Sequence, residues 1–332
     1  MKNNWISTAA AIVPLNVWHS LCQSPLILPY YHMVSDEALP HVEPLYQYRT
    51  VRQFTDDVDF FLKNYQPIGL ADLLAHINTG KILPKRAFLL SFDDGFREMA
   101  ETVAPILKAK GVPAIFFVNS AFVDNRELCF LQKIALVIAQ LKAKSPDGRE
   151  EKIKKILSAN KISGAEINPA LRSIDYAQRA VLDEMESACG LDFKMFLAQQ
   201  KPYLTSDQIR ALLRDGFAIG GHSVDHPFYG DLALNEQLRQ TKQSVDFVQK
   251  EFDVDYRAFA FPHSDAGVAT EFFERSYGDG TLQISFGTGG MLRDPWPKHF
   301  QRFSMEKTAL PPRPIVCRQY ARRLFRQSIC RS

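Results

Sequence analysis

The segment RAFLLSFDDGF, residues 86–96, combines an apolar run with an acidic turn. Residues 86–92 are almost continuously apolar, which is typical of a parallel strand that is covered on both faces. Asp93 and Asp94 follow this run directly. Because the active sites of α/β barrels are built from loops at the carboxyl ends of the strands, we expect both aspartates to lie at such a site.

Similar apolar runs recur along the chain, and helical patterns lie between most of them. The expected strands occupy residues 25–32, 86–92, 113–118, 217–220, 258–261 and 282–286. Alternating strands and helices are typical of βα units on a parallel sheet. The sequence therefore predicts an α/β protein whose single domain, residues 1–332, is a distorted (β/α) barrel.

One long segment interrupts this alternation. Residues 126–201 contain no clear strand, and Leu131, Ile134 and Ile138 recur there at helical spacing. We interpret the segment as a helical insertion within the barrel domain, which caps the barrel or binds a partner.

The composition indicates a globular protein without a strong charge bias. The chain has 332 residues, of which 46% are hydrophobic, and a net charge of +3, so we expect no nucleic-acid partner. The five cysteines form no CxxC pair, which argues against a cysteine-based zinc site and against a disulfide framework. The cysteines are odd in number and widely spaced, which favours a reducing compartment. We therefore expect a cytoplasmic protein.

Export is the alternative to a cytoplasmic location. Residues 5–15, WISTAAAIVPL, resemble the apolar part of a short signal peptide. However, this run is brief, contains Ser7, Thr8 and Pro14, and is followed by no convincing small-residue cleavage site. No stretch of the sequence is long and apolar enough to span a bilayer.

Residues 307–332 form a basic tail that contains no acidic residue. An apolar stripe and a basic stripe recur along it at helical spacing: Val316, Tyr320 and Leu324, with Phe325 and Ile329 close by, and Arg318, Arg322 and Arg326. Such a helix suits the surface of an anionic membrane, and peripheral association there would bring the protein near lipid-linked saccharides. Packing of the apolar stripe against the barrel is an equally good interpretation.

Two further polar segments follow expected strands. They are GGHSVDHP, residues 220–227, and FAFPHS, residues 259–264. The first holds His222 and His226 four positions apart, and two histidines with an acidic residue from elsewhere form a set of three ligands suited to zinc. Such a metal lowers the pKa of a water molecule, and a second carboxylate can accept that water's proton. Asp93 and Asp94 would supply one ligand and one base.

Each of these short motifs has an ordinary interpretation as well. Asp-Asp-Gly is common in turns, and two histidines four residues apart are as often a surface pair as a metal site. The combination favours the metal site, because both segments lie at the ends of expected strands.

Taken together, SFDDG, HSVDH and FAFP resemble the first three motifs of the polysaccharide deacetylase family, whose members deacetylate chitin, peptidoglycan and chitooligosaccharides. The resemblance covers roughly residues 26–290 without the insertion, and it implies the distorted barrel of that family. It also implies that Asp93 is the general base and that Asp94, His222 and His226 bind zinc or a similar divalent ion. The oxyanion of the tetrahedral intermediate would face the metal and a backbone N–H.

The chain departs from the family pattern in two places. Ala260 stands where the third motif usually has an arginine that orients the base, and Arg302 is a candidate to replace it. The late Leu-x-His motif that supplies the general acid is not recognisable. His263 and His299 are the candidates for the acid, and His263 is favoured because it follows a strand, although a structural role is a close alternative.

We expect the substrate to be an N-acylated glycan. His32, Pro262 and Arg302 are the candidate substrate-binding residues. The expected activity is that of a metal-dependent N-deacetylase, a hydrolase that removes an N-acetyl or other N-acyl group from an amino sugar of a polysaccharide, an oligosaccharide or a lipid-linked glycan. The alternatives are a deformylase or amidase that acts on a lipid-linked amino sugar, and a non-catalytic glycan-binding protein.

Overall fold

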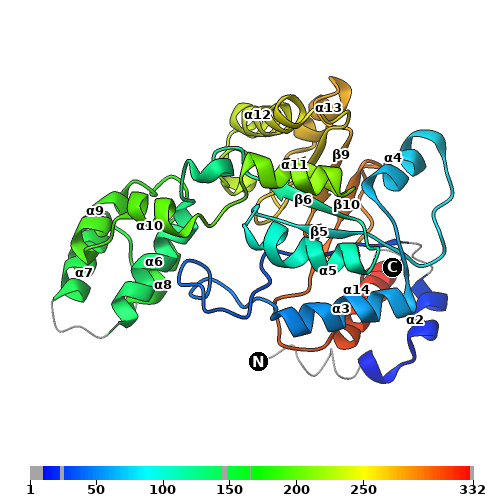
Figure 1. Ribbon diagram of the computed structural model, residues 1–332, viewed down its shortest axis with the longest axis horizontal. Coiled ribbons are helices and arrows are strands. Elements are labelled where there is room, and N and C mark those ends of the chain that lie inside the picture. The colour runs from blue at the N-terminus through cyan, green and yellow to red at the C-terminus, as the bar shows by residue number, and fades with distance from the viewer. Residues whose placement is uncertain (1–9, 23–25, 144–147, 165, 330–332) are drawn as a thin grey trace.

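The structure is a computed structural model that describes residues 10–22, 26–143, 148–164 and 166–329 (Figure 1). Its centre is a parallel sheet of eight strands in the order β10-β9-β8-β7-β6-β5-β2-β11, and this sheet curls into a nearly closed barrel. The strands are β2 (Pro29–Tyr31), β5 (Leu90–Phe92), β6 (Ala114–Val118), β7 (Ala218–Gly221), β8 (Ala258–Ala260), β9 (Ile284–Gly287), β10 (His299–Gln301) and β11 (Phe303–Ser304). The predicted fold class, a distorted (β/α) barrel, is confirmed.

Helices cover the outside of the barrel, as the alternating pattern predicts (Figure 1). They are α3 (Val51–Asn64), α4 (Leu70–Thr79), α5 (Ala104–Ala109), α11 (Ser206–Arg214), α12 (Leu234–Phe252) and α13 (Thr270–Gly278). Local sequence fixes several of their starts. Thr50 and Gln53 form a capping box at the start of α3, and Thr205 and Gln208 form another at α11.

The apolar run at residues 86–92 forms two strands, where the sequence predicts one. β4 (Ala87–Phe88) joins a small parallel sheet with β1 (Leu26–Ile27) and β3 (Gln66–Pro67), whereas β5 belongs to the barrel. The chain changes partners at Leu89, whose N–H donates to the carbonyl of Ile27. Hydrophobicity is the same on both sides of this point, so the apolar pattern does not reveal the change.

Two strands of the barrel have no counterpart in the sequence-based prediction. β10 and β11 lie in the segment HFQRFS, residues 299–304, where apolar and polar residues are mixed. β10 pairs with β9 and β11 pairs with β2, so together they bring the two edges of the sheet near each other. Arg302 is the single residue between them.

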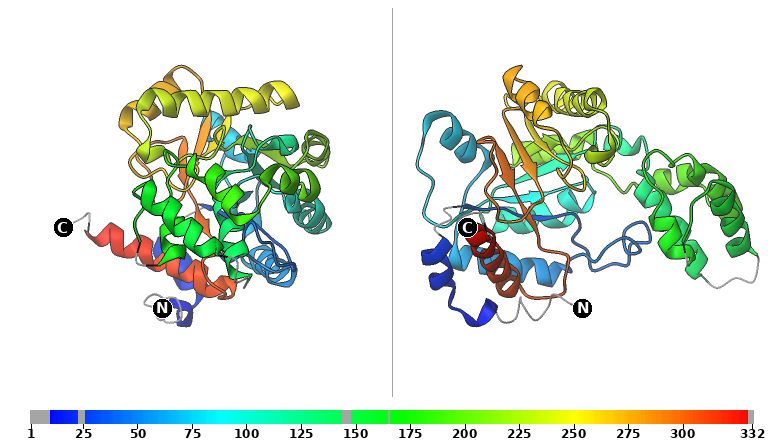
Figure 2. Two further views of the ribbon diagram at one scale, coloured as in Figure 1. Left: turned by 90° about the vertical axis from the view of Figure 1, so that its left-hand side faces the viewer. Right: turned by 180° about the vertical axis from the view of Figure 1, so that it is seen from behind.

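A helical lobe projects from the barrel between β6 and β7 (Figures 1 and 2). It contains α6 (Phe130–Lys142), α7 (Arg149–Ala159), α8 (Ile167–Arg172), α9 (Val181–Cys189) and α10 (Phe193–Gln200). These helices lie in the segment where the sequence predicts an insertion. The apolar core of the lobe extends to Phe96, whose ring stacks on Tyr203 at 5.6 Å, so the lobe is packed directly beside the Asp93-Asp94 turn.

The basic tail forms the helix α14 (Pro312–Ile329), which packs against α2 (Leu15–Cys22) and α3. Val316 and Tyr320 of its apolar stripe are fully buried, and Leu324 is half-buried. This burial favours packing on the barrel over insertion into a membrane surface. The side chain of Ile329 lies outside the described residues, as do residues 5–9 of the run that resembles a signal peptide.

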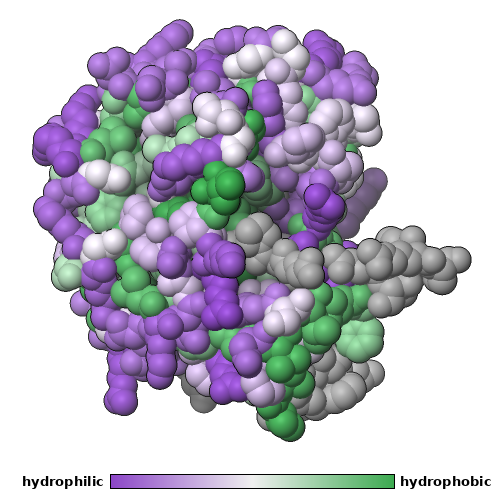
Figure 3. All heavy atoms as spheres, turned by 90° about the vertical axis from the view of Figure 1, so that its right-hand side faces the viewer, coloured by the Kyte–Doolittle hydropathy of each residue, from purple (hydrophilic) through white to green (hydrophobic). Residues whose placement is uncertain are grey.

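The side of the molecule that carries α2 is largely hydrophilic, and apolar side chains gather at its lower edge (Figure 3). Ile12, Val17 and Leu21 are among the exposed large apolar residues of the chain. Among the described helices, none is long and apolar enough to cross a membrane.

Candidate metal and catalytic site

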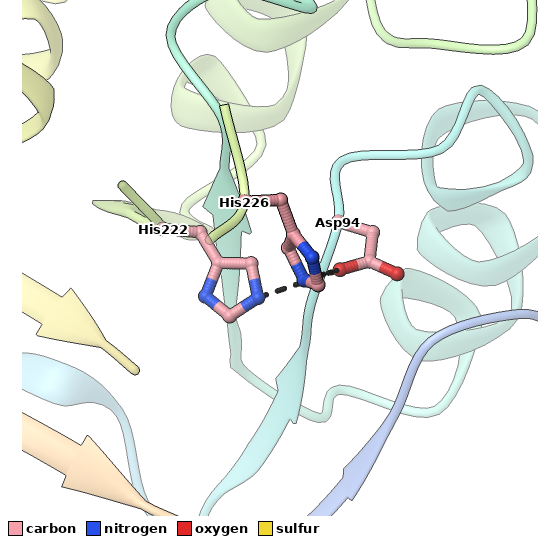
Figure 4. Close-up of side chains that lie close together, drawn as sticks. All are labelled: Asp94, His222 and His226. Carbon is pink, nitrogen blue, oxygen red and sulfur yellow. Dashed lines mark ion pairs between the residues drawn. The ribbon is translucent and has the colours of Figure 1, made fainter. Parts of the chain in front are cut away.

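Asp94, His222 and His226 point toward one another at the carboxyl ends of the barrel strands (Figure 4). Oδ1 of Asp94 lies 3.1 Å from Nε2 of His226 and 3.4 Å from Nε2 of His222. One ligand atom from each of the three residues lies within 4.8 Å of the others, and all three side chains are buried. The structure therefore brings together the three residues that the sequence predicts as metal ligands.

Backbone strain is concentrated in the loops that hold these side chains. Asp94, Ser223 and His226 have φ values of +71°, +67° and +66°, in the left-handed region that residues other than glycine rarely adopt. The Oγ of Ser223 accepts a hydrogen bond from the N–H of His226 and so holds the second histidine in place. Strained residues that persist at one site indicate that the surrounding structure enforces their geometry for a function.

The hydrogen bonds of the site indicate that these residues fit a cation. Nδ1 of His222 lies 2.8 Å from the carbonyl oxygen of Ala260. A carbonyl oxygen only accepts, so Nδ1 carries the proton and Nε2 turns a lone pair toward Asp94. Oδ1 of Asp94 is buried and accepts no hydrogen bond from the described residues. A divalent ion between these electron-rich atoms would relieve their mutual repulsion.

Asp93 forms a buried ion pair with Arg302. The two guanidinium nitrogens donate to Oδ1 and Oδ2 of Asp93 over 2.7 and 2.9 Å, and one of them also donates to Oγ of Ser91. Burial alone would raise the pKa of Asp93, but Arg302 outweighs it and lowers the pKa below its usual value. Asp93 is therefore held as an oriented carboxylate next to the three converging residues.

This position of Arg302 differs from the expectation that it contacts substrate. Its side chain is completely buried, and its guanidinium lies 4.7 Å from the ring of Tyr30. Arg302 lies in the connection between β10 and β11, and from there it contacts Asp93. It thereby takes the place of the arginine that the third motif usually has at the position of Ala260. A buried arginine that binds only protein groups orients Asp93 but has no surface to offer a glycan.

The two histidines proposed as general acid lie in different surroundings. The ring of His263 is at the rim of the site, 4.5 Å from the ring of His226. Loss of hydration and the neighbouring His226 lower the pKa of His263 to about 3, although exposure to solvent weakens this effect. A neutral imidazole is a poor proton donor, because its remaining N–H is only very weakly acidic, so His263 is a poor candidate for the acid. Pro262, its neighbour, is buried.

His299 does not face the site. Its ring is buried 5.0 Å from the ring of Phe273 on α13, and its Nδ1 lies 2.6 Å from Oγ of Ser285. His299, Asp265 and Asp294 could together hold a second ion. However, the amide nitrogen of Gln301 already donates to both carboxylates, over 2.6 and 3.0 Å.

A histidine on the other side of the barrel faces the site instead. Nδ1 of His32 lies 2.7 Å from Oε2 of Glu306, a nearly buried carboxylate that also accepts the N–H groups of His32 and Met33. Burial would lower the pKa of His32, but Glu306 outweighs it and, with Asp94 and Asp93, raises this pKa to about 9. Glu306 therefore favours the charged, doubly protonated form of the His32 imidazole.

Glu306 and a contact between the lobe and the histidine loop were not predicted from the sequence. Tyr176, in the lobe, donates from its hydroxyl to Asp225 over 2.5 Å, and Gln240 of α12 donates to the same carboxylate over 2.7 Å. Asp225 lies between His222 and His226. The position of Asp225 inside the HSVDH segment is a sequence signal that could have pointed to this residue. Its two partners, Tyr176 and Gln240, are 49 and 15 residues away from it in the chain.

The chain is similar to known proteins over much of its length. A family model described as polysaccharide deacetylase matches residues 80–167 and 177–278. A solved structure of the Streptococcus pyogenes deacetylase PplD in complex with acetate has a TM-score of 0.56 and 12% identity, over 87% of this chain and 97% of that chain. The structure of IcaB from Ammonifex degensii has a TM-score of 0.54 and 14% identity, over 89% and 97%. At these identities the two structures support the fold alone.

Two curated relatives, both N-deacetylases of Escherichia coli strains, match over a short segment. The poly-beta-1,6-N-acetyl-D-glucosamine N-deacetylase of Escherichia coli K12 is 38% identical over 61 residues. This alignment spans 18% of the present chain and only 9% of that relative.

Proposed function

The chain belongs to the polysaccharide deacetylase family, and from that premise we propose that it is a divalent-metal-dependent hydrolase that removes the N-acetyl group from an amino sugar of a glycan. The observation that carries this proposal is the convergence of Asp94, His222 and His226 beside the buried pair of Asp93 and Arg302. Two nitrogen ligands and one carboxylate suit zinc and similar divalent ions. Such an ion, when bound, polarises the amide carbonyl and activates a water molecule.

The remaining steps of the proposed mechanism use side chains of the barrel. Asp93 accepts a proton from the attacking water, because Arg302 keeps its carboxylate ionised and oriented. The amine that leaves the tetrahedral intermediate needs a proton. His32 can donate one, since Glu306 keeps the imidazole charged and fixes its Nδ1, leaving Nε2 for the substrate.

The pH dependence of activity tests the role of Glu306. In the Glu306→Gln variant, loss of the negative charge lowers the pKa of His32 toward its ordinary value of about 6.5. The alkaline limb of kcat/KM follows deprotonation of the acid and should therefore move to lower pH in this variant. A bound cation lowers the pKa of His32 in both proteins, so the metal-loaded forms are compared. His32→Gln serves as the control in which this limb is lost with most of the activity. An alkaline limb at the same pH in wild type and Glu306→Gln would show that His32 is not the acid.

A turnover assay tests the proposed function itself. The purified chain should release acetate from N-acetylated glucosamine oligosaccharides, lose this activity after treatment with a chelator, and regain it when Zn²⁺ is added. N-formylated substrates in the same assay separate a deformylase from a deacetylase. Acetate release that is unaffected by the chelator would contradict metal dependence. Glycan binding without turnover by the metal-loaded protein would identify a binding protein.

A further inference from the structure

A basic groove opens between α14 and the loop that follows β9. It consists of two adjoining cavities of about 210 and 300 Å³, which share Gly289, Arg318, Gln319 and Arg322 in their walls. The first cavity is also lined by Lys307 and by the hydroxyl-bearing residues Thr288 and Thr308. No acidic residue lines either cavity.

The cations of the groove have no counter-charge. Among the described residues, none forms an ion pair with Lys307, Arg318 or Arg322. Arg318 and Arg322 lie one turn apart on α14, so their like charges are neighbours on the same wall of the groove, and partial burial together with Arg322 lowers the pKa of Arg318. The nearest carboxylate in sequence, Glu306, is occupied by His32 and by backbone N–H groups. An anion in the groove would remove this repulsion.

Gln319 is a second polar feature of the groove, independent of its charges. Its side chain lines both cavities and is 9% exposed, yet its amide forms no hydrogen bond with any described residue. The backbone approaches it closely, since a Cβ on Gly290, where φ is +94°, would lie 2.9 Å from Oε1 of Gln319. The amide is therefore placed to bind a polar group within the groove.

Direct contacts join the groove to two residues that adjoin the proposed site, His263 and Arg302. Thr288 donates from its hydroxyl to the carbonyl of His263 over 3.0 Å, and the N–H of Gly290 donates to the carbonyl of Arg302 over 2.9 Å. Lys307 follows Glu306 directly in the chain. These walls lie after β9 and β11, at the same carboxyl end of the barrel as the converging histidines. A glycan whose amide reaches Asp93 could therefore place a neighbouring substituent in the groove.

We propose that this groove is a subsite for a phosphoryl group carried by the glycan substrate, with Lys307, Arg318 and Arg322 as its charged contacts and Gln319 as a hydrogen-bond partner. The proposal rests on the proposed function and names a substrate class for it. Two arginines and a lysine match a dianion better than the single charge of a carboxylate, and the planar fork of arginine suits the oxygens of a phosphate.

Binding of inorganic phosphate tests the groove without a need for turnover. Isothermal titration of the metal-loaded protein should show phosphate binding, and the double variant Arg318→Gln/Arg322→Gln should bind it about tenfold more weakly, or about 1.4 kcal/mol. Arg313→Gln is the matched control, since Arg313 lies on the same helix and lines neither cavity. The single variant Arg322→Gln changes only an exposed side chain. It replaces the double variant in the titration if the double variant folds poorly. Equal affinities in wild type and both groove variants would overturn the proposal.

A comparison of two substrates then separates the groove from the catalytic site. N-acetylglucosamine oligosaccharides with and without a phosphate monoester are assayed with wild type and the double variant. Only the KM of the phosphorylated substrate should rise in the variant, by about tenfold as for phosphate binding, whereas the neutral substrate should be turned over equally. The same KM for both substrates in wild type would refute the subsite and leave the deacetylase intact. No turnover of either substrate, with phosphate still bound, would instead contradict the proposed function.

Discussion

Replacing Asp93 with asparagine is expected to lower kcat by about 10²- to 10⁴-fold while the protein keeps its metal. The amide of asparagine has the size of the carboxylate but cannot accept a proton from water. Asp93 lies outside the set of converging ligand atoms and has both oxygens bound by Arg302. Its replacement should therefore remove the base without removing a ligand. The measurement is kcat together with metal content, each per folded protein.

This variant needs a control for stability, because it leaves the buried guanidinium of Arg302 without its counter-charge. Breaking a buried ion pair costs about 3–5 kcal/mol, so part of any loss could come from unfolding. Ser91→Ala removes a different hydrogen bond to the same guanidinium and leaves Asp93 in place. That variant should be destabilised but remain active. If folded Asp93→Asn protein turned over substrate near the wild-type rate, Asp93 would not be the base.

Alanine at His222 or at His226 is expected to abolish metal binding and, with it, activity. Each substitution removes one of three protein ligands. Even the loss of residues that only support metal ligands weakens metal affinity by 10- to 100-fold, so the loss of a ligand should weaken it by more than about 100-fold. Metal content is measured by elemental analysis after dialysis against buffer with a low concentration of free Zn²⁺.

His263→Ala is the matched control for this experiment. His263 packs its ring 4.5 Å from that of His226 but is outside the group of converging ligand atoms, so this variant should retain the ion. Full metal content in both His222→Ala and His226→Ala would refute the ligand assignment. Loss of metal in all three variants would show that the ring contact of His263 is needed to hold His226 in position.

The barrel and the three side chains that converge in it were predictable from the amino-acid sequence. Each depends on local information: an apolar run marks a buried strand, and a polar motif directly after it marks the carboxyl end of that strand. Since the carboxyl ends of parallel strands gather at one end of a barrel, Asp94, His222 and His226 could be expected to meet. Helix α14 was predictable in the same way, because its periodicity is local.

The residues that support the site became known from the folded structure. Arg302 reaches Asp93 from 209 residues away, from the connection between β10 and β11, and Glu306 reaches His32 from 274 residues away, from the loop after β11. Periodicity shows which side of an element is apolar, but not what that side packs against, so the burial of Val316 and Tyr320 on the barrel could not be predicted. Likewise, the prediction that Arg302 binds substrate and that His263 is the general acid was based on the positions of these residues in the chain. The charge state and contacts of a side chain depend on neighbours that folding brings together from distant segments, and no local pattern encodes them.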